Sequence, residues 1–228
     1  MNQDNPALAQ RRRNRVVIIA LTTVLLALIL AMSLLAHSIG TSGVASRPSN
    51  QASQFAGPVF PAGLSAAPFS LTDQDGKRAT LSQYRGRVLV LTFIHSHCRD
   101  ACPLMVTEIR GALDQLPGQG RDVPVLGISV DPFHDTRTSA RAFLARQHMT
   151  GRMRFLLGRF ARLRPIWRHY AIQPEVDAFG HELSGGHSAY VMLIDRRGFL
   201  RVGFPAGNLV PEDLAHDLKL LLDRRGPH

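Results

Sequence analysis

The chain has 228 residues, room for one good-sized domain with short additions, and its 45% hydrophobic content is enough for a real core. The formal net charge of +10 comes almost entirely from arginine. No basic run is interleaved with aromatic residues, and no nucleic-acid-binding module is recognisable, so we expect no nucleic-acid partner. The charge instead predicts a cationic surface suited to anionic lipids or an acidic partner.

The N-terminus predicts where the chain resides. Residues 1–15 form a basic segment with Arg11, Arg12, Arg13 and Arg15, and residues 16–36 are an uninterrupted apolar run. That run reaches the ~20 residues that span a bilayer as a helix, and it exceeds the apolar core of a cleavable signal peptide. Arginines stay on the cytoplasmic side, so we expect a single-pass inner-membrane protein with its C-terminal domain in the periplasm. Cleavage after Ala45 is the alternative.

Residues 37–63, rich in Ser, Gly, Ala, Pro and Gln, predict a flexible linker, and residues 64–228 are the expected domain. A strand is expected at 68–72, followed by a turn at Asp75-Gly76, a second short strand and a helical turn at 80–85. Apolar runs then predict strands at 88–93, 123–130, 154–157, 189–194 and 199–204. Helices are expected from Pro103 to about 116 and at 136–148, 160–170 and 211–222.

This order consists of two βα units, a β-hairpin and a closing helix. Parallel strands need crossover helices, whereas a hairpin adds antiparallel strands, so the sheet should be mixed with helices on both faces. Together with a paired-cysteine turn between a strand and a helix, the order predicts a thioredoxin-like α/β domain behind one N-terminal transmembrane helix.

The only two cysteines, Cys98 and Cys102, lie in the turn between the 88–93 strand and the helix that Pro103 is expected to begin. The positive end of a helix dipole favours the thiolate, the form that reacts or binds metal. Residues four apart on a helix are close enough for a disulfide. A purely structural bond closing so small a loop would stabilise little, so we favour a functional pair.

Two functions compete for the pair. Thiol–disulfide exchange normally uses Cys-x-x-Cys, whereas three residues separate these cysteines. Soft-metal binding is the other function, since two thiolates and one imidazole select Cu(I) or Zn over hard cations. The third ligand would then come from one of ten histidines.

His187 is the best-placed histidine, because it directly precedes the 189–194 strand and its loop should face the cysteine turn in the predicted topology. An ordinary surface histidine is the alternative. His95 and His97 lie beside Cys98, where a ligand next to another ligand is geometrically awkward. Asp131 and Asp135 follow a strand end, where α/β sites gather. Asp135 or Thr136 could cap the next helix, or the aspartates could support the ligands from behind.

With these motifs in place, the chain resembles the SCO/SenC family of copper chaperones from about residue 66 to 222. The matching pieces are Phe93 to Pro103, with the His-Cys-x-x-x-Cys-Pro pattern, Ile128 to Pro132 with Asp135-Thr136, and His187-Ser188-Ala189 followed by Leu193-Ile194-Asp195 and Gly198. The chain departs from the family's pattern at Arg99, where proline is usual, and at Gly186, where aspartate is frequent.

The resemblance implies a membrane-anchored domain that binds one copper, as Cu(I) and also as Cu(II), through Cys98, Cys102 and His187. Asp131, Asp135 and His97 are candidates to support these ligands. The implied partner is the copper-bearing subunit of cytochrome c oxidase, and the implied role is to mature its dinuclear copper site, by delivering copper to it or by reducing its cysteines. Because an oxidising compartment would keep the thiols oxidised, we also expect a thioredoxin-like reductant as a partner. We therefore expect a chaperone and not an enzyme.

The rival class is a membrane-tethered thiol–disulfide oxidoreductase or a peroxidase-like enzyme. Thioredoxin-type oxidoreductases carry a cis-proline loop against the active cysteines, whereas Gly186-His187-Ser188 stands at that place here. A third class, a redox or copper sensor signalling through the membrane helix, stays open.

Overall fold

A computed structural model describes residues 23–28, 30, 32, 54–183 and 188–224. The chain divides into two compact units, residues 1–52 and residues 53–228. In the first unit, residues 23–28, 30 and 32 are helical, and the rest of the predicted 16–36 anchor lies outside the described residues. Within the described part of the chain, no helix has the length and apolar character needed to cross a membrane.

The second unit is built on one seven-stranded sheet in the order β2-β1-β5-β4-β3-β6-β7. β3, β4 and β5 are parallel, whereas β1, β2, β6 and β7 pair antiparallel with their neighbours, so the expected mixed sheet is confirmed. The strands are β1 (Ser70–Asp73), β2 (Arg78–Thr80), β3 (Leu89–Ile94), β4 (Val125–Ser129), β5 (Met153–Leu157), β6 (Tyr190–Ile194) and β7 (Leu200–Pro205).

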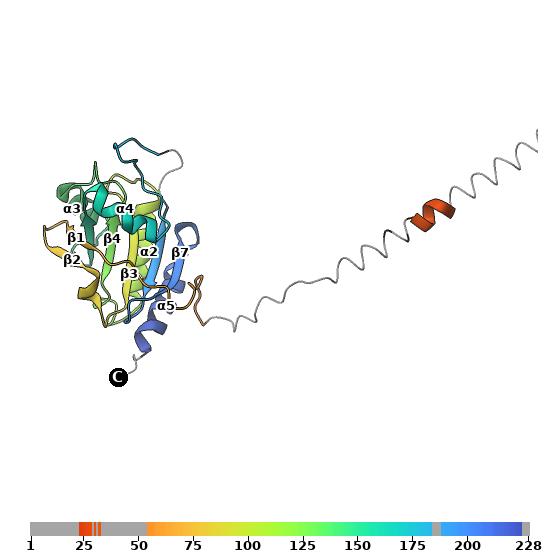
Figure 1. Cartoon of the computed structure of the whole chain (residues 1–228). Helices are drawn as coiled ribbons and strands as arrows, with labels where there is room; N and C mark the ends of the chain where they lie inside the picture. The colour runs from red at the N-terminus through yellow and green to blue at the C-terminus, as the bar shows by residue number, and fades with distance from the viewer. Residues whose placement is uncertain (1–22, 29, 31, 33–53, 184–187, 225–228) are drawn as a thin grey trace, which may run out of the picture. The chain divides into compact units, whose positions relative to one another are not determined.

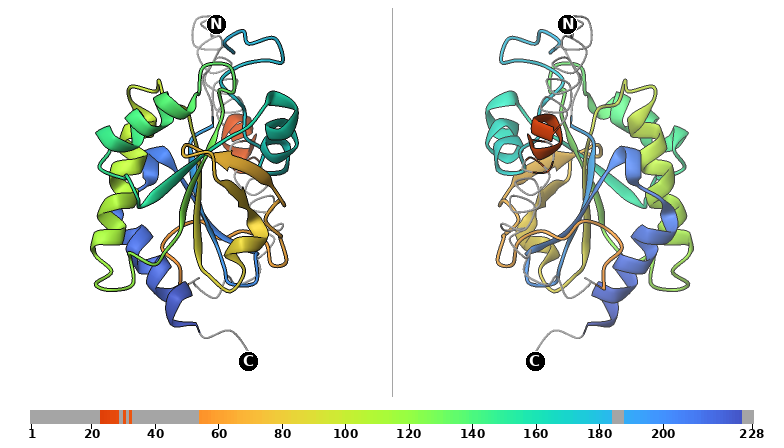
Figure 2. Two further views of the ribbon diagram at one scale, coloured as in Figure 1. Left: turned by 90° about the vertical axis from the view of Figure 1, so that its left-hand side faces the viewer. Right: turned by 90° about the vertical axis from the view of Figure 1, so that its right-hand side faces the viewer.

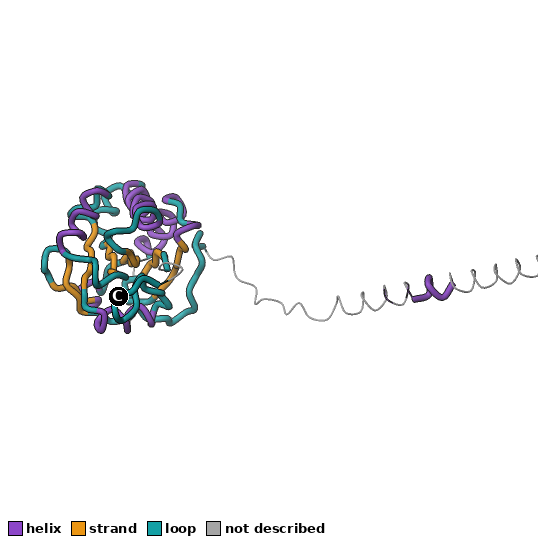
Figure 3. The backbone as a smooth tube through the Cα atoms, turned by 90° about the horizontal axis from the view of Figure 1, so that it is seen from above, coloured by secondary structure: helices purple, strands orange, loops and turns teal. Residues whose placement is uncertain are grey.

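Helices cover both faces of the sheet, as the sequence predicts (Figure 1). They are α2 (Ala101–Asp114), α3 (Arg137–Arg146), α4 (Phe160–His169) and α5 (Pro211–Asp223), with the short helices η1 (Leu81–Tyr84) and η2 (Ala206–Asn208). In the side views, α2, α3 and α5 lie on one face and α4 on the other (Figure 2). Seen from above, the strands lie between the helices and loops of the two sides (Figure 3).

β3 divides the interior into two cores, because its side chains alternate between the faces of the sheet. Val90 and Ile94 pack with α2, α3 and α5. Leu91 and Phe93 pack with α4 on the other face, around Trp167. Every residue of β3 is buried, which explains why its sequence is an apolar run instead of an alternating one. The central strand is therefore fixed on both sides, and the loop that follows it starts from a rigid position.

The predicted linker over 37–63 extends too far into the domain. Phe55 is buried in the α2–α5 core, and Val59 forms a β-bridge with Val202. The buried carboxylate of Asp217 on α5 accepts hydrogen bonds from the backbone N–H groups of Ala56, at 2.7 Å, and Gly57, at 3.0 Å. Composition alone suggested a tether, but these backbone donors are satisfied by a helix some 160 residues away. The domain therefore includes residues from 54 onward.

Candidate metal centre

The two cysteines lie at the carboxyl end of β3, where the sequence places them. Cys98 is half-buried in the turn and Cys102 is buried in the first turn of α2. The helix starts two residues earlier than Pro103, at Ala101, and the Asp100 side chain accepts the first N–H. Pro103 is still tolerated, because the first N–H groups of a helix have no intrahelical partner. The site end of the sheet is thus the end that also carries the loops after β4.

The helix N-terminus acts directly on one sulfur. The N–H of Cys102 donates to the Sγ of Cys98 at 3.1 Å. Such an N–H and the positive end of the helix dipole favour negative charge on that sulfur. The pKa of the Cys102 thiol is raised well above its ordinary value by its hydrogen bond to Cys98, by burial and by the charge of Cys98. The pair therefore holds a proton at Cys102 that a thiolate-binding metal must displace.

One histidine completes a three-donor group with the two sulfurs. Ligand atoms of His95, Cys98 and Cys102 all lie within 4.8 Å of one another. Burial lowers the pKa of His95, but the hydrogen bond to Cys98 and the charges of Cys98, Glu175 and Asp135 outweigh it, so the pKa is raised. Two sulfurs and one imidazole nitrogen are a donor set for a soft metal ion. The group contains no oxygen ligand of the kind that hard cations prefer.

The sequence interpretation set His95 aside as awkwardly close to Cys98, whereas the structure places it beside the two sulfurs. The Cys98 N–H donates to the His95 carbonyl at 3.4 Å, so residues 95 to 98 form a tight turn. Residues three apart in such a turn approach each other, whereas the objection to adjacent ligands applies only to His97. The spacing His-x-x-Cys directly after a buried strand was the signal that could have identified His95.

His187 lies outside the described residues, so its distance from the sulfurs is not part of the structure. The flanking residues lie at the cysteine end of the sheet. Thr92, near the end of β3, donates its hydroxyl to the Tyr190 carbonyl at 2.8 Å. The Ser188 N–H donates to the Gln173 carbonyl at 3.1 Å, and the Gln173 N–H donates to the Ser188 hydroxyl at 3.1 Å. The strand that follows the His187 loop therefore begins beside the strand that leads to the cysteines.

Asp135 holds the start of the cysteine turn. Its carboxylate is buried and accepts hydrogen bonds from the Ser96 N–H at 2.7 Å, the Ser96 hydroxyl at 2.6 Å and the Ser129 hydroxyl at 2.6 Å. Burial raises the pKa of Asp135 in spite of these bonds. The N-cap of the following helix is Thr136, whose hydroxyl accepts from the Ser139 N–H. Asp135 therefore does not cap that helix, and its carboxylate bonds to the cysteine turn instead.

Asp131 and His97 are placed differently. Asp131 accepts from His134, with the Nδ1 atom 2.9 Å from its carboxylate, and does not contact Ser96. His97 is exposed, with its Nδ1 3.2 Å from the Ser96 hydroxyl and its ring edge-on to His134. Of the two aspartates expected to support the ligands, Asp135 is the one that accepts hydrogen bonds from the turn, through the N–H and hydroxyl of Ser96.

Exposed apolar side chains lie around this end of the domain. Leu104 is in the first turn of α2, Phe133 follows β4, and Phe179, 82% exposed, lies in a small hairpin closed by the Val176–Glu182 bridge. The hairpin packs on the β4 loop, because Gly180 lies against the Phe133 ring. Exposed apolar groups beside a site are typical of a surface that another protein covers.

The family model for SCO1/SenC matches residues 61–223. The chain is 31% identical over 85 residues to the SCO1 protein homolog of Bacillus subtilis, a match covering 37% of this chain and 44% of the relative. The match thus spans less than half of that relative's length. Among solved structures, Bradyrhizobium japonicum ScoI with copper bound is 29% identical with a TM-score of 0.58, covering 68% of this chain and 98% of that one.

A second solved structure, BsSco, agrees in fold at 23% identity and a TM-score of 0.61, covering 72% of this chain and 97% of that one. It is described as a member of the Sco family of cytochrome c oxidase assembly proteins, with a disulfide switch.

Proposed function

The chain belongs to the SCO1/SenC family, and from this premise we propose that it is a copper chaperone that binds one copper ion between Cys98, Cys102 and an imidazole. The observation that carries the proposal is the group of two sulfurs and one imidazole nitrogen within 4.8 Å. Copper is the cargo of this site. The recipient that we propose is the dinuclear copper centre of cytochrome c oxidase. The proposal is supported by the description of BsSco, which belongs to a family of cytochrome c oxidase assembly proteins.

Two imidazoles compete for the third position. His95 already stands beside the sulfurs, and His187 is the ligand that the family resemblance implies. We propose that both serve: three donors satisfy Cu(I), and a fourth completes the set preferred by Cu(II). Protons compete with copper for Cys102 and His95, and both pKa values are raised, so copper affinity should fall as the pH is lowered.

Variants of the two histidines test this ligand set. We expect His187→Ala to lower Cu(I) affinity by at least the ~10–100-fold seen when a metal site loses even an outer partner, and His95→Phe to lower it as well. The double variant should lose more than either alone. The measurement is a competition titration of the reduced protein against a Cu(I) chelator. His216→Ala on α5, exposed and away from the cysteines, is the matched control and should bind like the wild type.

Each result assigns the ligand. Unchanged Cu(I) affinity in His187→Ala would remove His187 from the Cu(I) site, and unchanged Cu(I) affinity in His95→Phe would remove His95 from it. Unchanged affinity in both variants would contradict the proposal of a thiolate–imidazole copper site.

We also propose that residues 16–36 anchor the chain in the inner membrane, with residues 1–15 in the cytoplasm and the domain in the periplasm. The apolar run and the preceding arginine cluster support this topology. A reporter that is active only outside the cytoplasm, fused after His228, should be active. Activity of a cytoplasm-dependent reporter at the same position would contradict the topology. In an oxidising compartment the thiols need a reductant, for which we propose a thioredoxin-like partner.

Thiol–disulfide exchange is the second candidate function, and one observation favours it. The more exposed sulfur, that of Cys98, accepts a hydrogen bond from the helix N–H of Cys102, which favours a thiolate. Such a sulfur can attack a disulfide, after which Cys102 can resolve the mixed disulfide. Rapid catalytic reduction of a protein disulfide by the wild type, unaffected by His187→Ala, would favour this function over copper delivery.

A further inference from the structure

The end of the domain opposite the cysteines is rich in arginine. Because β3, β4 and β5 are parallel, the segments that precede them meet at one edge of the sheet, together with the β6–β7 turn. α5 also ends there, since Arg196 donates to the Leu222 carbonyl. Five exposed arginines lie at this edge, which we call the arginine end: Arg85, Arg87, Arg121, Arg197 and Arg224.

The arginines of this end outnumber the aspartates near them, of which Asp122 is the one without a salt bridge among the described residues. In the part of the chain that the structure describes, none of the five forms a salt bridge. Three nearby aspartates already have cationic partners, since Asp114 pairs with Arg152, Asp195 with Arg201 and Asp223 with Lys219. The five guanidinium groups therefore present charge that is available to an anionic surface.

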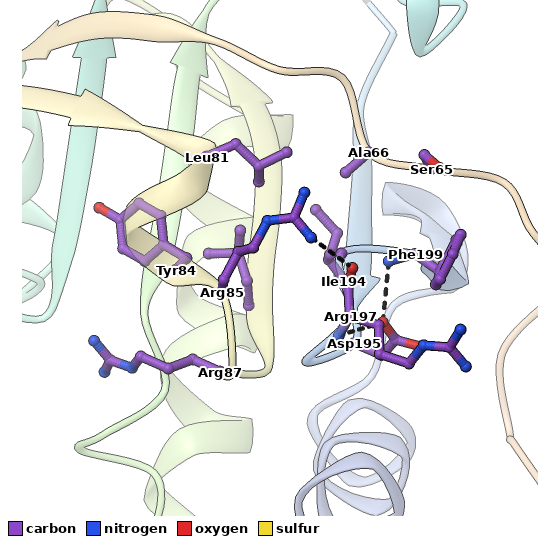
Figure 4. Close-up of a pocket in the computed structure, with 12 residues that line it drawn as sticks. Ser65, Ala66, Leu81, Tyr84, Arg85, Arg87, Ile194, Asp195, Arg197 and Phe199 are labelled. Atoms are coloured by element: carbon purple, nitrogen blue, oxygen red, sulfur yellow. Dashed lines mark hydrogen bonds between the residues drawn. The ribbon is translucent and has the colours of Figure 1, made fainter. Parts of the chain in front are cut away.

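A cavity connects several of these arginines. Arg85, Arg87 and Arg197 line a space of about 190 Å³ between η1 and the β6–β7 turn. In Figure 4 the Arg85 side chain points toward the Arg197 carbonyl, to which it donates at 3.4 Å. Arg87 also lines a second hollow, of about 650 Å³, together with Arg121. Arg85, Arg87, Arg121 and Arg197 thus line two hollows that have Arg87 in common.

The chain enters the domain at this same end. The Arg224 guanidinium donates to the Gln54 side chain at 3.2 Å and lies over the Phe55 ring, 4.9 Å from its centroid. Only 17 residues, 37–53, separate Gln54 from the apolar run at 16–36. If that run is held in a bilayer, as in the proposed function, a link of this length keeps the point of entry within a few tens of ångströms of the lipid.

We propose that the arginine end binds the anionic phospholipids of the membrane that holds the N-terminal segment, which turns the cysteine end away from the lipid. Each arginine close to an anionic surface contributes roughly fivefold in affinity, and the effect decays within a Debye length. Guanidinium groups bind lipid phosphate through paired N–H donors. An acidic protein could meet the same charge, but the nearby point of chain entry favours the lipid surface.

The test uses the full chain with phosphatidylcholine vesicles that do or do not contain phosphatidylglycerol, read by flotation and by hydrogen exchange. We expect amide exchange at residues 84–88, 119–122 and 195–198 to slow by about fivefold or more with the anionic vesicles only, since one arginine contributes this much. Exchange at residues 96–104 should not change. High salt should abolish the difference, because the Debye length falls to about 3 Å at 1 M.

A charge-reversal variant and a matched control locate the effect. Arg85→Glu, Arg121→Glu and Arg197→Glu together should remove the slowing. The matched control makes the same change in net charge on the exposed side of α4, with Arg162→Glu, Arg164→Glu and Arg168→Glu together. This control should leave the slowing of amide exchange intact. Equal loss in both triple variants would overturn the proposal, because net charge and not this surface would then decide binding.

Flotation separates this proposal from the membrane anchor. Failure to float with neutral vesicles would argue against the anchor, while slowed exchange with anionic vesicles would still support the arginine end. Equal exchange with both kinds of vesicle would overturn the lipid surface, whether or not the chain floats.

Discussion

Replacing either cysteine by serine should lower Cu(I) affinity by more than ~100-fold, beyond the loss expected for an outer partner of a metal site. The hydroxyl is a hard, neutral donor, and it cannot replace the thiolate that a soft ion requires. In Cys98→Ser the helix N–H of Cys102 also loses the sulfur to which it donates. The measurement is the same chelator competition, with the reduced wild type as reference.

Folding must be checked in the same samples. Cys102 is fully buried, so a serine there places a hydroxyl in the core near Met105, whereas Cys98 is only half-buried. Thermal unfolding by circular dichroism should show Cys98→Ser close to the wild type and Cys102→Ser less stable. Retention of wild-type copper affinity in a folded Cys98→Ser would refute the site.

Asp135→Ala should have the second largest effect, on both stability and copper binding. The substitution leaves the Ser96 N–H and two hydroxyls without their acceptor, and we expect the free energy of unfolding to fall by about 2–4 kcal/mol. Ser96 separates His95 from His97, so the turn that holds the donors should lose its fixed geometry. Copper affinity should fall ~10–100-fold, as for other partners that orient ligands.

Asp131→Ala is the control for this prediction, because it removes a buried carboxylate from the same loop without touching Ser96. We expect it to keep copper affinity within a factor of a few of the wild type. If Asp131→Ala and Asp135→Ala weakened copper binding equally, the specific role of the Asp135–Ser96 contact would be wrong. Denaturant unfolding and chelator competition on the same preparations provide both readouts.

The raised pKa of Asp135 adds a pH dependence with a definite sign. Burial makes the folded state bind this proton more tightly than the unfolded state, whose pKa is about 3.9. The stability contributed by the protonated form is therefore present at low pH and is lost as the pH rises through the folded-state pKa. Asp135→Asn has no carboxyl group to titrate at this position. Its unfolding free energy should therefore decline less than that of the wild type between about pH 4 and the folded-state pKa of Asp135.

The order of elements followed from the sequence, because each element carries its own local pattern. Apolar runs identified β3 and β4, and the apolar positions of α5 recur with helical spacing. Cys98 and Cys102 were correctly placed after a buried strand for the same reason: the strand end and the helix start are both local features. Their identity as soft donors is a property of the residues themselves, and no tertiary contact is needed to recognise it.

The tertiary structure decided which distant residues meet, since this depends on strand order and loop conformation. A turn of the backbone brought His95 to the sulfurs, and the parallel pairing of β3 with β4 brought Asp135 to Ser96 across 39 residues. Asp217 bound residues 56 and 57, which composition had assigned to a linker. The arginine end is likewise made of separate segments, because parallel strands bring their preceding loops to one edge of the sheet.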